Sequence, residues 1–221
     1  MELDLKKMNL RDVNDKLQNL DRKQNQRDFK IINPEGNHAL CAGLTEEMNV
    51  TIKGHVGYYC AGMNQKAQIT IDGNVGTGVA ENMMSGRVHV KGNASQSAGA
   101  TAHGGLLIID GDASSRCGIS MKGVDIVVKG SVGHMSGFMS QSGNLIVCGD
   151  AGEAKREGDR VRTRDVQEDD RSIEGESWIS RFREDSGSKL ETRIREAKET
   201  GERFQQRICP AQKLGTGSQR G

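Results

Sequence analysis

Hydrophobic and polar residues alternate along residues 50–152 in a unit that repeats every nineteen positions. Apolar residues stand four and two positions before a recurring glycine, and the position between them is polar in units such as Ile69-Thr70-Ile71. The recurring glycines are Gly54, Gly73, Gly92, Gly111, Gly130 and Gly149. Such alternation is typical of a β-strand with one face turned inward, so each unit is predicted to contain one strand.

Each unit continues regularly after its glycine. A Val or Ala follows two positions later, which predicts a glycine corner and then a second, short inward-facing strand. A small residue stands seven positions after each of the first five glycines and indicates a tight turn or a close contact between layers. These small residues are Ala61, Ala80, Gly99, Gly118 and Gly137.

The length of the unit restricts how its strands connect. Nineteen residues are too few for a strand, its turns and a crossover helix, so successive strands are predicted to coil directly onto one another. The predicted fold is all-β, a parallel β-helix whose coils lie about 4.8 Å apart.

Three regions follow from this pattern. Residues 1–30 are predicted to hold a short amphipathic helix and a linker, residues 31–154 the β-helix, and residues 155–221 a charged tail. Apolar residues from Leu10 to Leu20 fall at helical spacing after a possible cap at Asn9, and residues 24–30 form the charged linker. The helix either packs on the end of its own domain or docks a partner.

The last part of the chain departs from the repeat. Residues 153–221 contain 16 Lys or Arg and 15 Asp or Glu, and the next glycine position of the series is occupied by Glu168. A disordered tail, a helical arm that includes residues 190–204, and a frame-shifted end replacing further coils all fit this composition. If the frame is shifted, the last coil is uncapped and exposes a strand edge.

Composition and charge exclude several classes of protein. The 31 Lys and Arg residues balance 30 Asp and Glu residues to a net charge of +1, which gives no electrostatic case for binding nucleic acid or an anionic membrane. No apolar run has the length of a signal peptide or of a membrane-spanning segment, so a soluble cytoplasmic protein is expected.

The residues that could carry chemistry do not form a recognisable site. Cys41, Cys60 and Cys117 are separated by multiples of nineteen, so they are predicted to share one column as packing residues; a thiol metal site is the alternative. The histidines share no column, and they are His38, His55, His89, His103 and His134. The segment from Gly73 to Gly78 reads GxxGxG and lacks the order of a dinucleotide fingerprint. No catalytic, cofactor-binding or metal-binding residue is predicted.

The repeat, together with the segments 96–105 and 111–124, resembles the GXGXG domain of the glutamate synthase large subunit. The resemblance covers roughly residues 10–154 and is greatest to the stand-alone GXGXG subunit of N-methylglutamate synthase, with one component of formylmethanofuran dehydrogenase as a more distant relative. It implies a right-handed β-helix that is structural. In that family, FMN and the iron-sulfur cluster belong to a synthase subunit, and the hetero-oligomer also contains a class II glutamine amidotransferase-like subunit.

The resemblance implies a noncatalytic subunit that positions the amidotransferase-like and FMN-binding subunits of a glutamate-synthase-type complex. Four outward strand positions are apolar and are predicted to be docking positions: Leu106, Ile108, Val127 and Ile146. One alternative is a stand-alone β-helix enzyme such as an acyltransferase, although those proteins have coils of about 18 residues built from hexapeptides. A carbohydrate-binding or assembly solenoid is another, and an aromatic content of 3% argues against sugar stacking.

Overall fold

A computed structural model of the chain describes residues 1–20, 26–152 and 163–165. The chain divides into one unit of Met1–Val166 and another of Gln167–Gly221. All described residues belong to the first unit. The predicted helix at residues 190–204 and the position of Glu168 lie outside the described residues.

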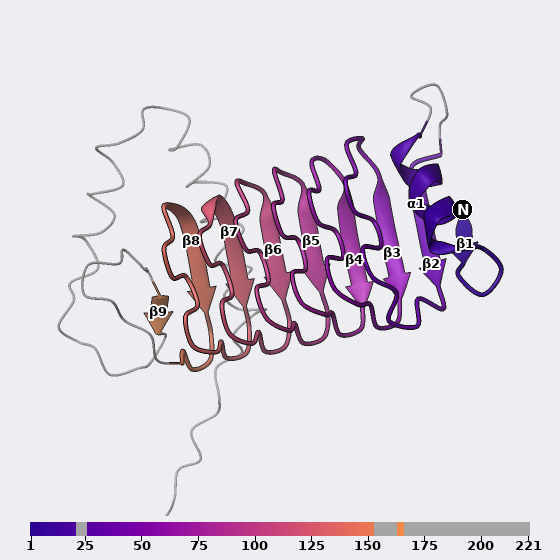
Figure 1. Cartoon of the computed structure of the whole chain (residues 1–221). Helices are drawn as coiled ribbons and strands as arrows, with labels where there is room; N and C mark the ends of the chain where they lie inside the picture. Colours follow the sequence, from indigo (N-terminus) through magenta and orange to yellow (C-terminus); the bar gives the residue numbers. More distant parts are fainter. Residues whose placement is uncertain (21–25, 153–162, 166–221) are drawn as a thin grey trace, which may run out of the picture. The chain divides into compact units, whose positions relative to one another are not determined.

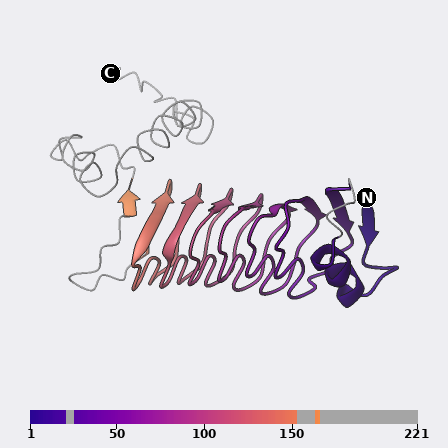
Figure 2. The same cartoon turned by 90° about the horizontal axis from the view of Figure 1, so that it is seen from above.

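One parallel sheet runs through the described chain, with its strands in sequence order (Figure 1). Its strands are β1 (Glu2–Asp4), β2 (Asp28–Ile32), β3 (Asn49–Lys53), β4 (Gln68–Asp72), β5 (Arg87–Val90), β6 (Leu106–Ile109), β7 (Lys122–Val128), β8 (Ser142–Val147) and β9 (Thr163–Asp165). From β3 to β8 each strand pairs with residues nineteen positions further on, as in Val50 with Ile69, except that Lys122 at the start of β7 pairs with Ser142, twenty positions on. The predicted parallel β-helix is therefore confirmed. Figure 2 shows the strands along one side of the coils and the turns along the other.

The two inward positions of each strand from β3 to β8 form one side of the core. These side chains are at most 1% exposed: Val50, Ile52, Ile69, Ile71, Val88, Val90, Leu107, Ile109, Ile126, Val128, Leu145 and Val147. Burying one such side chain stabilises the fold by roughly 1.5–3 kcal/mol. Because each coil adds the same pair, the coils stack into one continuous apolar column.

A second stacked column follows the glycines. Single parallel bridges join Val56, Val75, Ala94, Ala113, Val132 and Ala151 from coil to coil. The short strand predicted here is thus reduced to one bridging residue in each coil. The coils approach closely at the next residue where it is glycine: a Cβ on Gly76 would lie 2.5 Å from the carbonyl carbon of Gly57.

The small residues seven positions after the glycines do form tight turns. Their φ angles lie between 54° and 69°, in the left-handed region. Two further positions in each turn, two residues before and two after, are left-handed as well, as Tyr59 and Met63 are around Ala61. The position is also buried and closely packed, since a Cβ on Gly99 would lie 2.7 Å from Cδ1 of Ile126, so a small residue is favoured there.

The amino-terminal segment closes one end of the solenoid. Helix α1 (Leu10–Gln18) is capped by Asn9, whose side chain accepts a hydrogen bond from the N–H of Asp12. Val13 and Leu17 on α1 are fully buried in the core, so the helix packs on the end of its own domain. Asn14 fixes the helix to the first coil, because its amide donates to the C=O of Ala39 (2.9 Å) and its Oδ1 accepts from the N–H of Cys41 (2.9 Å).

The ends of the sheet extend further than the repeat predicted. Strand β1 pairs with β2, and β2 begins at Asp28, inside the segment expected to be a linker. At the other end, β9 lies within the segment expected to be a tail and pairs with Leu145, Ile146 and Val147 of β8. Its spacing from β8 is eighteen residues rather than nineteen, as in Leu145 with Thr163. No helix among the described residues has the length and apolar character needed to cross a membrane.

Candidate docking face of the sheet

The outward side chains of β3–β8 lie in three parallel rows, which together we call the outer face. The first row contains Asn49, Gln68, Arg87, Leu106, Asp125 and Asn144. The middle row contains Thr51, Thr70, His89, Ile108, Val127 and Ile146. The charged row stands just before the glycines and contains Lys53, Asp72, Lys91, Asp110 and Lys129.

The middle row changes from polar to apolar along the sheet. Thr51, Thr70 and His89 on the first three strands are half-buried. Ile108 and Val127 are only 2% and 7% exposed although they stand in the same outward row, whereas Ile146 is 42% exposed. Of the four predicted docking positions, Ile146 and the half-buried Leu106 are thus the ones that reach solvent.

The charged row alternates in sign. Lys53 Nζ lies 2.6 Å from Asp72, Lys91 lies 3.9 Å from the same carboxylate, and Lys129 lies 2.7 Å from Asp110. The hydrogen bond from Lys53 and its charge hold the pKa of Asp72 below its ordinary value. Because the two pairs at Asp72 are largely exposed, each contributes little to stability on its own. Their effect is to fix the orientation of charges along one edge of the face.

His89 joins this row through Asp110. Its Nε2 lies 3.0 Å from Oδ1 of Asp110, and both side chains are about one-quarter exposed, at 22% and 26%. Burial alone would raise the pKa of Asp110, but hydrogen bonds from Lys129 and His89 outweigh it and the pKa is lowered. Sequence reasoning missed this pair. The spacing of twenty-one residues, one coil plus two, is the signal that could have found it.

A histidine–carboxylate pair can support catalysis when a nucleophile accompanies it. The structure shows His89 in a hydrogen bond with Asp110, which joins the middle row of one coil to the charged row of the next.

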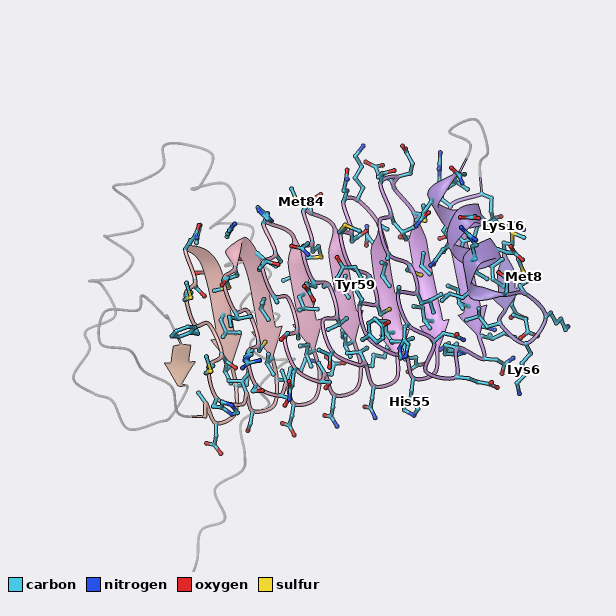
Figure 3. The ribbon with its side chains drawn as sticks, in the orientation of Figure 1. Lys6, Met8, Lys16, His55, Tyr59 and Met84 are labelled. Carbon is cyan, nitrogen blue, oxygen red and sulfur yellow. The ribbon has the colours of Figure 1, made fainter. Side chains whose placement is uncertain are left out.

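A ladder of side-chain hydrogen bonds runs along the corner of the coils. We call this series of residues the corner ladder. Its members directly follow the repeated glycines: His55, Asn74, Asn93, Asp112, Ser131 and Asp150. Each side chain accepts from the backbone N–H of the next member at 2.8–3.0 Å. Figure 3 shows His55 at the edge of the sheet where β3 ends.

The corner ladder explains the repeated glycines. A Cβ on Gly92, Gly111 or Gly130 would lie under 3.0 Å from the acceptor oxygen of the ladder residue in the preceding coil. Only Gly54 among the six has a left-handed φ, 128°. The predicted glycine corners are present, but in the other five the glycine is required by the close approach of the preceding coil and not by a left-handed φ.

A solvent-open groove of about 640 Å³ crosses the starts of β3, β4 and β5. It is lined by Arg27, Glu47, Met48, Asn49, Gln65, Lys66, Gln68, Ser85 and Gly86. Amides, two cations and one carboxylate mix here without an arrangement that defines a reaction. Its lining follows the repeat in part, since Glu47, Lys66 and Ser85 are nineteen residues apart, as are Asn49 and Gln68.

The cysteine column is only partly as predicted. Cys60 and Cys117 occupy equivalent positions, since their C=O groups accept from the N–H of Ala80 and Gly137, each twenty residues further on. In the first coil Leu40 takes this role by accepting from Ala61 N–H, so Cys41 is displaced by one residue. All three thiols are fully buried, as packing residues are, and burial raises the pKa of Cys60 and Cys117 to about 12.

The other candidate residues are dispersed. Among the described residues there is no group of three or more His, Cys, Asp or Glu side chains placed to hold a metal ion. His103 and His134 are exposed, and His38 stacks on Tyr58 with ring centroids 4.0 Å apart. Cys209 lies outside the part of the chain that the structure describes.

Comparison with known proteins identifies no relative of this chain. No protein-family model, no curated protein and no solved structure matches it.

Proposed function

We propose that this chain is a noncatalytic structural subunit of a glutamate-synthase-type complex, with N-methylglutamate synthase favoured over ordinary glutamate synthase. In this role it holds an amidotransferase-like subunit and a synthase subunit with FMN and an iron-sulfur cluster in a fixed relation. The chain itself binds neither cofactor. The proposal rests on the sequence resemblance of the repeat and on the suitability of the solenoid as a rigid spacer.

Rigidity is the first property that supports a spacer. Each coil is fixed to the next by the paired strands, the single bridges and the corner ladder, so consecutive coils are bonded at three places. The glycines leave no room for side chains between coils at the corner. A partner bound to one coil is thereby held in a set orientation relative to a partner bound to another.

The second property is the composition of the outer face, and the proposal depends mainly on this observation. Its middle row is polar on β3–β5 and apolar on β6–β8, so its two halves suit different partners. A contiguous apolar patch on a protein surface is typical of contact sites, and Ile108, Val127 and Ile146 are neighbours in the middle row. Leu106 and Ile146 are the positions best suited to direct contact, because Ile108 and Val127 already lie out of solvent.

The test is co-expression of this chain with an amidotransferase-like subunit and an FMN-binding synthase subunit of N-methylglutamate synthase. The double variant Leu106→Asp with Ile146→Asp is compared with Thr51→Asp and Thr70→Asp, which add the same charges to the polar half. We expect the first variant to lose one partner on size-exclusion chromatography while keeping the circular dichroism of the parent. Complexes that persist unchanged refute docking through this half, and turnover by the purified chain alone would favour an enzyme instead.

A further inference from the structure

We draw no further inference here: the strongest candidate, the solvent-open groove across the starts of β3, β4 and β5, is lined by amides and by charges of both signs, and nothing in the described part of the chain shows what would occupy it.

Discussion

Replacing Gly111 by alanine tests why the repeat demands glycine. The new Cβ would lie under 3.0 Å from Oδ1 of Asn93 and 3.0 Å from the carbonyl oxygen of Gly92. Oδ1 of Asn93 is also the acceptor for the N–H of Asp112, at 2.9 Å. The side chain of Asn93 must therefore move, and this bond of the corner ladder must break.

The magnitude follows from three opposing effects. Overpacking costs roughly 1–3 kcal/mol, and the lost hydrogen bond costs about 1 kcal/mol. Because φ of Gly111 is not left-handed, the alanine gains about 0.4–1 kcal/mol from a less disordered unfolded chain. The net expectation is a loss of about 1–3.5 kcal/mol in the free energy of unfolding. Asn93→Ala, which removes only the bond, should cost about 1 kcal/mol.

A double-mutant cycle distinguishes this explanation from backbone strain. With Asn93→Ala already present, the acceptor oxygen is gone and the alanine at position 111 meets only Gly92 at 3.0 Å. The double variant should therefore be more stable than the sum of the single changes predicts, by at least about 1.5 kcal/mol. Free energies come from urea unfolding followed by circular dichroism. Additivity within about 0.5 kcal/mol would refute the reasoning, because uncoupled sites add in that way.

Three further predictions concern other parts of the chain. Cys41, Cys60 and Cys117 should resist a thiol reagent in the folded protein and react after denaturation, because burial raises their pKa values and excludes the reagent; rapid labelling of any of these three in the folded chain, located by mass spectrometry, would contradict their burial. Leu17→Ala should lower the free energy of unfolding, measured in urea, by about 2–5 kcal/mol, because it leaves a cavity under the amino-terminal cap. Lys16→Ala, at an exposed position on the same helix, should lower it by well under 1 kcal/mol. Asp110→Asn should lower the free energy of unfolding at neutral pH. Because the pKa of Asp110 in the folded chain lies below 3.8, the difference in free energy between variant and parent should vanish as the pH falls through that folded value. A difference that stays constant down to pH 2 would show that the carboxylate charge is not its source.

The fold could be predicted from the sequence because its structural unit is also its sequence unit. Strict spacing of Val50, Ile69 and their equivalents fixed both the strands and their register. The additional strands β1 and β9 could not be predicted in this way, since neither keeps the nineteen-residue spacing. The predicted position of Cys41 in the cysteine column was wrong by one residue for a similar reason. The first coil is irregular, and the nineteen-residue spacing alone cannot show where in the coil the irregularity lies.

The candidate face was only partly predictable. Outward positions such as Leu106 and Ile146 follow from alternation along a strand, but their exposure does not. The pair of His89 and Asp110 depends on which residues become diagonal neighbours between coils. The corner ladder was visible in the sequence as six acceptor-bearing residues after the glycines, yet its bonding became evident only when the backbone N–H groups of the next coil were placed.

The most direct test of the scaffold is to omit it. The amidotransferase-like and FMN-binding subunits are co-expressed with and without this chain, and their association is measured by size-exclusion chromatography with light scattering. We predict a complex of all three chains when this chain is present, and separate partner subunits when it is absent. Equal association of the two partners without it, or elution of this chain alone from the three-chain mixture, would contradict the proposed role.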